Sequence, residues 1–215
     1  MTVQRLGPPP AAGRVDARTG WLAAHVSEAQ RDVREVYVGG FFGQLVSGVV
    51  WLIAAAVGTW VSPGAAMLAL WLGGCLIFPV TTLALRLSRG PAALPKGHPM
   101  APLATQIAFT VPIGMLLAVA LGLDRPQLFF PACMLIVGAH YLPFAFLYGM
   151  RLFVVLAATL VASGLVIAMW IPGSFSTGAW VTGIILMAFA FLLRHSIGSR
   201  PEEGPGALRA APQGG

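Results

Sequence analysis

The sequence has 215 residues, of which 57% are hydrophobic and only 9% are charged. An average soluble domain is about a quarter charged and at most half apolar, so this composition excludes an ordinary soluble globular protein. A mean hydropathy of +0.81 requires long apolar segments, and the chain has room for about six membrane spans of roughly 20 residues each. We therefore expect one membrane domain, without a separate catalytic or nucleic-acid-binding domain.

The N-terminal region divides into two predicted parts before the first apolar segment. Residues 1–15 include Pro8, Pro9 and Pro10 and predict a disordered tail. Over residues 16–36, apolar residues recur at helical spacing between charged ones, which predicts an amphipathic helix at the cytosolic membrane interface. The first 36 residues have no apolar stretch typical of a signal peptide, so we expect the first span itself to direct insertion.

Six apolar segments follow, and each is long enough to cross about 30 Å of hydrocarbon as a helix. Turn signals such as Ser62-Pro63-Gly64 and Pro172-Gly173-Ser174 separate them. The pattern predicts an all-α, polytopic transmembrane bundle over residues 37–195, followed by a second disordered tail over residues 196–215. The predicted spans are Tyr37–Val61, Gly64–Leu85, Leu103–Leu123, Gln127–Tyr148, Leu152–Ile171 and Thr177–Leu193.

The charged residues predict the orientation of the bundle. All but one of the 13 Lys and Arg residues fall on one side of the predicted spans, and the exception, Arg125, follows Asp124 directly. Because cationic flanks remain in the cytoplasm, we expect both termini there. Trp60, Trp170 and Trp180 fall at the opposite interface, as an aromatic belt requires. The net charge of +6 thus indicates topology, and we expect no nucleic acid among the partners.

The composition also suggests a source and a membrane. Arg far outnumbers the single Lys, and the chain has 26 Gly and 17 Pro, a bias typical of GC-rich bacterial genomes. We therefore expect the protein in the cytoplasmic (inner) membrane of a bacterium, with the lipid bilayer as its main partner.

The apolar segments lack several chemistries that membrane proteins use. No Asp, Glu, Lys or Arg lies deep in a predicted span, which disfavours ion pumps, proton-coupled carriers and retinal proteins. The motifs of intramembrane proteases are missing as well. Cys75 and Cys133 fall in apolar segments and are expected to be free thiols. Cys133 is about 10 Å along the helix axis from His140, with no other ligand at metal spacing, so we expect no metal site and no cofactor.

His140 is the one strongly titratable side chain inside a span, which by default marks a candidate functional site. Two interpretations remain open: a structural His140 that is hydrogen-bonded to a neighbouring helix, or a ligand site or polar pathway. Other polar side chains in the spans could line such a pathway. The candidate set is His140, Tyr141, Gln44, Gln106, Thr81 and Thr82.

A second candidate site lies at the cytosolic ends of the spans. Arg86, Arg89 and Arg151 could contact anionic lipid headgroups there. The topology requirement alone also accounts for these charges.

Four stretches resemble a family of small bacterial multi-pass membrane proteins classed as a domain of unknown function. They are RDVREVYVGGFFGQLVSGVVW (31–51), Ile77-Phe78-Pro79, HPMAPL (98–103) and FFPACMLIVGAHYLPFAFLYG (129–149). The resemblance covers about residues 28–195. It implies a six-helix integral membrane protein without an established activity, and it supplies no catalytic residues.

Three classes of function remain open. A membrane-embedded protein that binds or transports a small ligand would use the region of His140 and Tyr141, and predicts a hydrated cavity. An accessory or structural protein would hold a second copy of itself or a partner through small-residue stripes, and predicts a dry bundle. A lipid-modifying enzyme would use His98, Arg86 or Arg151 at the cytosolic rim, and predicts an open groove there. We rank them in this order, so an enzyme is the less expected outcome.

Overall fold

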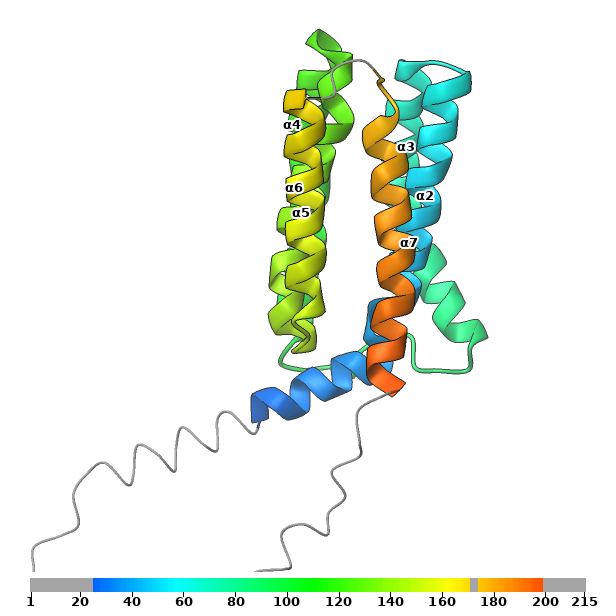
Figure 1. The fold of residues 1–215 in the computed structure, drawn as a ribbon. Helices are drawn as coiled ribbons and strands as arrows, with labels where there is room; N and C mark the ends of the chain where they lie inside the picture. Colours follow the sequence, from blue (N-terminus) through cyan, green and yellow to red (C-terminus); the bar gives the residue numbers. More distant parts are fainter. Residues whose placement is uncertain (1–24, 171–173, 199–215) are drawn as a thin grey trace, which may run out of the picture.

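The computed structural model describes residues 25–170 and 174–198. Within these ranges the fold is all-α, with a short helix over residues 25–36 and six long helices (Figure 1). The six are long and apolar enough to span a membrane, which confirms the predicted fold class. The predicted tail over 1–15, the first part of the predicted amphipathic helix and residues 199–215 lie outside the described ranges. The elements are η1 (Val38–Gly40), α2 (Phe41–Trp60), α3 (Pro63–Leu87), α4 (Ala101–Asp124), η2 (Pro126–Leu128), α5 (Phe129–Tyr148), α6 (Leu152–Trp170) and α7 (Thr177–Gly198).

Local chemistry sets several helix boundaries. Ser62 caps α3 by accepting a hydrogen bond from the backbone N–H of Ala65 at 3.2 Å, and Pro63 occupies the first turn, where a missing N–H costs nothing. Gly149 ends α5 in a left-handed conformation. Prolines also lie inside α3, α4 and α5, and after Pro79 the end of α3 leans away from the bundle (Figure 1).

The helices form a ring that is open at one place. Helix α2 packs against α3 and α7, α6 packs against α5 and α7, and α4 packs against α5. The neighbours that would close the ring, α3 and α4, make little contact with each other. The bundle therefore has a lateral seam between α3 and α4.

Aromatic side chains fill the middle of the ring. Phe129, Phe130 and Phe153 are fully buried. The rings of Trp51 on α2 and Phe130 on α5 lie 6.0 Å apart and connect these two helices inside the ring. Such ring pairs contribute about 0.5–1.5 kcal/mol beyond the area that they bury.

The helix over residues 25–36 packs across one end of the bundle and buries Ala29 and Val33. A turn at Val38–Gly40 joins it to α2, and all three of its residues have positive φ values between 50° and 86°. Glycine adopts such angles without steric cost, which explains the Gly39-Gly40 pair at this bend. The N-terminal helix thereby runs in a different direction from α2.

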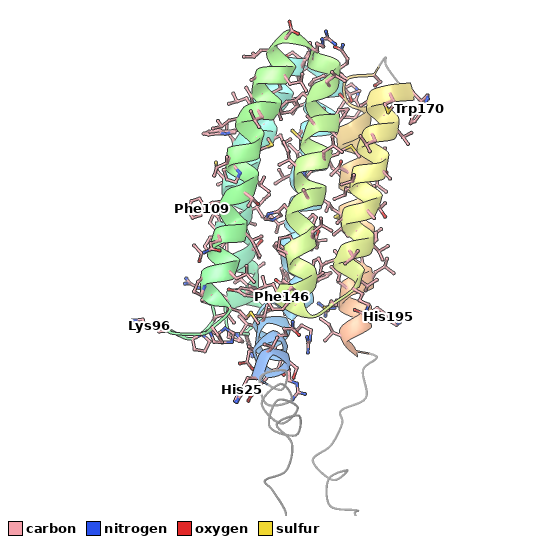
Figure 2. The ribbon with its side chains drawn as sticks, turned by 90° about the vertical axis from the view of Figure 1, so that its left-hand side faces the viewer. His25, Lys96, Phe109, Phe146, Trp170 and His195 are labelled. Carbon is pink, nitrogen blue, oxygen red and sulfur yellow. The ribbon has the colours of Figure 1, made fainter. Side chains whose placement is uncertain are left out.

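The two ends of the bundle differ in chemistry. Lys96, His25 and His195 lie at the end covered by the N-terminal helix, whereas Trp170 lies at the other (Figure 2). Near Trp170, the rings of Trp60 and Trp180 lie 6.0 Å apart, and Trp180 Nε1 donates a hydrogen bond to Thr59 Oγ1. Tryptophan side chains are typical of a membrane interface.

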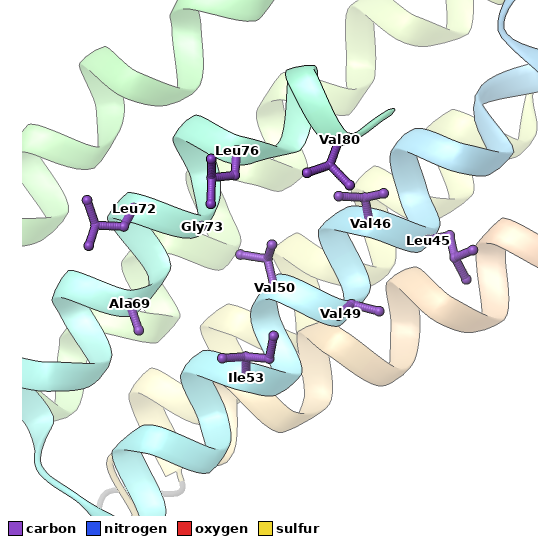
Figure 3. Close-up of a pocket in the computed structure, with 10 residues that line it drawn as sticks. All are labelled: Leu45, Val46, Val49, Val50, Ile53, Ala69, Leu72, Gly73, Leu76 and Val80. Carbon is purple, nitrogen blue, oxygen red and sulfur yellow. The ribbon is translucent and has the colours of Figure 1, made fainter. Parts of the chain in front are cut away.

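An outward-facing groove of about 540 Å³ runs between α2 and α3 and is lined entirely by apolar residues (Figure 3). Val46, Val50 and Ile53 form one wall, and Ala69 and Leu76 lie on the other. This is the surface that a helix presents to lipid chains.

Candidate ligand cavity between helices α3 and α4

A cavity of about 360 Å³ lies inside the open ring and is lined by residues of α2, α3, α4 and α5. Several lining residues are also exposed on the outside of the bundle. On α3 these include Trp71 and Phe78, which are 46% and 75% exposed, and on α4 they include Ala108 and Pro112. The cavity therefore opens sideways at the seam where α3 and α4 scarcely touch.

The cavity walls carry no charged side chain among the described residues, and most of the lining is apolar. Polar groups enter from Ser47 on α2, Thr81 and Thr82 on α3, and His140 and Tyr141 on α5. A largely apolar cavity with a few polar groups is the usual composition of a site for a small molecule.

His140 is half-buried, and one edge of its ring is fixed by α4. Its Nδ1 lies 2.9 Å from Thr110 Oγ1, and Thr110 in turn donates its single hydroxyl proton to the carbonyl of Ile107 at 2.7 Å. While that proton is used there, Nδ1 of His140 is the donor to Thr110, and the neutral imidazole, which carries one N–H, presents Nε2 as an acceptor. The backbone of Ile107 also interacts directly with the ring.

Two prolines leave further acceptors on the cavity walls. Proline has no N–H, so Pro79 cannot form the regular helical bond to the carbonyl of Cys75, and Pro112 cannot form the one to Ala108. Both Cys75 and Ala108 line the cavity. Two residues of the lining therefore have backbone carbonyl groups that lack the regular helical donor.

Behind the cavity, Tyr141 faces α2. It is 5% exposed, and its hydroxyl lies beside the side chains of Gln44 and Ser47. Gln44 is 3% exposed, yet its Oε1 has no hydrogen-bond partner within the described part of the chain, and the same holds for Oγ1 of Thr81. Unsatisfied buried polar atoms are costly, and in native proteins they frequently mark functional sites.

Tyr37 closes the cavity at the end beneath the N-terminal helix, outside the spans. Partial burial raises the pKa of Tyr37 above its ordinary value, and an interaction with the backbone of Leu94 partly offsets this shift. The uncharged phenol is therefore the favoured form at this position.

The structure brings together four of the six residues of the candidate pathway. His140, Tyr141, Thr81 and Thr82 line the cavity, and Gln44 is buried behind Tyr141. Gln106 lies elsewhere: it is exposed on α4, one turn beyond the start of the helix, and does not line the cavity.

The three arginines of the second candidate site, Arg86, Arg89 and Arg151, are exposed at the end of the bundle that carries the N-terminal helix. They lie at the ends of α3 and α6, and none of them lines the cavity. Their lipid contacts stay a prediction.

Sequence reasoning missed the lateral seam and one polar pair. Asp32 on the N-terminal helix pairs with His98 in the loop between α3 and α4. Residues 66 positions apart give no local signal of such a contact.

The sulfur atoms of Cys133 and Met115 lie 3.4 Å apart in the core. Across residues 25–170 and 174–198 no group of three His, Cys, Asp or Glu side chains could hold a metal ion. This sulfur pair is therefore part of the apolar packing.

The fold and the cavity define a multi-pass α-helical membrane protein. The chain belongs to the family of unknown function DUF7010, which matches residues 26–196. This match confirms that the chain belongs to a family of unknown function, as the resemblance implied. No curated protein matches the chain, and neither does any solved structure.

Proposed function

We propose that this protein binds a small apolar molecule that is dissolved in the membrane and enters through the seam between α3 and α4. The observation that carries the proposal is the cavity of about 360 Å³, which opens toward the lipid and contains the imidazole of His140. Cavities that bind small molecules are commonly about 300–1,000 Å³ in volume.

The cavity favours a binding protein over the two alternatives. An accessory protein predicts a dry, closely packed bundle, which does not explain a cavity with a polar wall. A lipid-modifying enzyme predicts chemistry at the rim, but His98, Arg86 and Arg151 do not line the cavity. The ring nitrogens of His98 are also occupied, by Asp32 and by the backbone N–H of Met100.

Photolabelling of the purified protein in lipid nanodiscs tests the proposal. The probe is an uncharged alkyl chain of ten carbons that carries a diazirine and has no polar head. We expect saturable labelling of cavity residues such as Trp71 and Val111. Labelling that does not saturate and is confined to outward-facing residues such as Phe109 would overturn the proposal.

A matched pair of variants on α4 supports the experiment. Ala108→Phe places a large side chain at the seam and should reduce saturable labelling at least tenfold. Ala120→Phe makes the same substitution at an exposed position of the same helix that does not line the cavity, and should leave labelling unchanged. Equal labelling of the two variants would contradict the assigned entrance.

We also propose that both termini lie in the cytoplasm and that the membrane is the cytoplasmic membrane of a bacterium. This orientation is supported by the arginines at the end of the bundle that carries the N-terminal helix, which are Arg86, Arg89, Arg151 and Arg194. Among the described cationic residues, Arg125 alone occurs at the other end, 3.5 Å from Asp124. Cytoplasmic retention of cationic flanks favours this orientation.

Single cysteines in a Cys75→Ala, Cys133→Ala background test the orientation. A membrane-impermeant maleimide added to intact cells should label Gln127→Cys and spare Lys96→Cys. The reverse pattern would invert the topology.

A further inference from the structure

We propose that the ligand carries an uncharged hydrogen-bond donor, such as a hydroxyl group, on an apolar body, and that this donor docks on Nε2 of His140. The inference rests on the proposed function and specifies the chemical class of the ligand. It follows from counting which polar groups of the cavity are free to donate and which are free to accept.

The strongest acceptor is Nε2 of His140. When Thr110 donates to the carbonyl of Ile107 and accepts from Nδ1, Nε2 carries no proton and is an acceptor. An acceptor-only ligand group, such as an ether or a ketone, would place two acceptors against each other. A hydroxyl group would satisfy Nε2 instead.

The backbone adds acceptors on both sides of the seam. The carbonyls of Cys75 and Ala108 lack their regular helical donors, because positions 79 and 112 are prolines. In a lipid environment a carbonyl without a donor is costly, which favours a ligand that brings its own donor.

Two hydroxyl groups of the cavity walls are engaged within the protein. Thr82 donates its hydroxyl proton to the carbonyl of Phe78 at 2.9 Å. The Tyr141 hydroxyl lies beside Gln44 and Ser47 on α2. Thr81 has an unpartnered hydroxyl that can donate or accept, so it suits the oxygen of an alcohol as well.

The same lining excludes charged ligands. No Lys, Arg, Asp or Glu lines the cavity within the described ranges, so a carboxylate or an ammonium group would lose its hydration without gaining a counter-ion. The head group must therefore be neutral.

Competition with the headless photolabel in wild-type protein tests the proposal without any substitution. The competitors share one alkyl chain and differ only in the head group: dodecanol, dodecyl methyl ether, dodecanoate and dodecylammonium. Comparison is made at equal membrane concentrations. We expect dodecanol to displace the label at a concentration at least tenfold lower than that of the ether or of either ion.

Two variants test whether His140 is responsible for the preference for the alcohol over the ether. His140→Phe keeps an aromatic ring but removes Nε2, and should abolish the advantage of the alcohol over the ether. His25→Phe is the control: it makes the same substitution on the N-terminal helix, at a position that does not line the cavity, and it should keep the advantage.

The experiment distinguishes a failure of the proposed function from a failure of the proposed ligand class. Absence of saturable labelling overturns the proposed function and this inference with it. Saturable labelling that all four competitors displace equally, or that an ion displaces best, overturns the donor class and leaves the proposed function standing. An alcohol preference that persists in His140→Phe overturns the role of Nε2.

Discussion

Nε2 of His98 lies 3.3 Å from Oδ2 of Asp32, and this contact ties the loop between α3 and α4 to the N-terminal helix. Nδ1 of the same ring accepts a hydrogen bond from the backbone N–H of Met100 at 3.2 Å. With Nδ1 accepting, the proton sits on Nε2 and is donated to the carboxylate. The imidazole, 6% exposed, is satisfied at both nitrogens.

Removing the carboxylate should destabilise the fold. Asp32→Ala leaves the Nε2–H of His98 buried without its partner, which costs about 1–3 kcal/mol. Thermal unfolding in nanodiscs should show a lower midpoint for Asp32→Ala. Glu35→Ala, at an exposed position of the same helix, is the control and should unfold like wild type. Identical unfolding midpoints for the two variants would mean that the contact between Asp32 and His98 contributes nothing to thermal stability.

The N-terminal helix is also held by two hydrogen bonds to α5. Gln30 Nε2 donates to the carbonyl of Phe146 at 2.6 Å, and Arg34 Nη1 donates to that of Tyr148 at 2.5 Å. These carbonyls belong to the last turn of α5, and that of Phe146 also accepts from the backbone N–H of Gly149 at 3.2 Å. Gln30→Leu with Arg34→Leu should therefore release the helix and increase amide hydrogen exchange over residues 25–36 at least tenfold.

The control for this double variant is Arg31→Leu, which removes an exposed charge from the same helix. Its exchange over residues 25–36 should stay close to that of wild type. Equal exchange in wild type and the double variant would show that these two hydrogen bonds do not hold the helix.

Close packing of α2 against α3 depends on Gly73. A Cβ atom at this position would lie 2.5 Å from Cγ1 of Val50, whose branched side chain has little freedom to move. Gly73→Ala should lower the free energy of unfolding by about 1–3 kcal/mol through overpacking. Gly74→Ala meets no atom within 4 Å and should be neutral or stabilising, by up to about 1 kcal/mol. Denaturant unfolding distinguishes the two.

Tyr37 should make the stability depend on alkaline pH. Its raised pKa means that the folded protein holds the phenol proton more tightly than the unfolded chain. The stabilisation is fully present below the ordinary tyrosine pKa of about 10 and is lost as the pH rises through the folded-state value. Above about pH 10 the free energy of unfolding should fall more steeply for wild type than for Tyr37→Phe. Parallel curves would contradict this assignment.

The positions of the spans could be predicted because length and hydropathy alone decide them. The predicted span Thr177–Leu193 and the observed α7 (Thr177–Gly198) share their first residue, and the predicted Gly64–Leu85 lies within α3. Packing was not predictable in the same way. When a helix is apolar all round, its sequence does not indicate which face meets lipid and which meets a neighbour.

The same limit applies to the candidate site. His140 and Thr81 were identifiable because polar side chains are rare in apolar segments. Gln106 satisfied the same criterion, yet it is exposed near the start of α4, where an amide can reach interfacial water. The seam itself depends on which helices fail to touch, a long-range property that no local pattern encodes. The pairing of Asp32 with His98 is long-range for the same reason.

The two hydrogen bonds between the N-terminal helix and α5 impose an order on biosynthesis. Gln30 leaves the ribosome well before Phe146, which follows it by 116 residues. The helix over residues 25–36 therefore cannot form these two bonds while the first three spans are being inserted. Until the fourth span is present, the amphipathic surface of this helix can lie on the bilayer. Docking of the helix onto α5 can therefore be completed only after the fourth span has been synthesised.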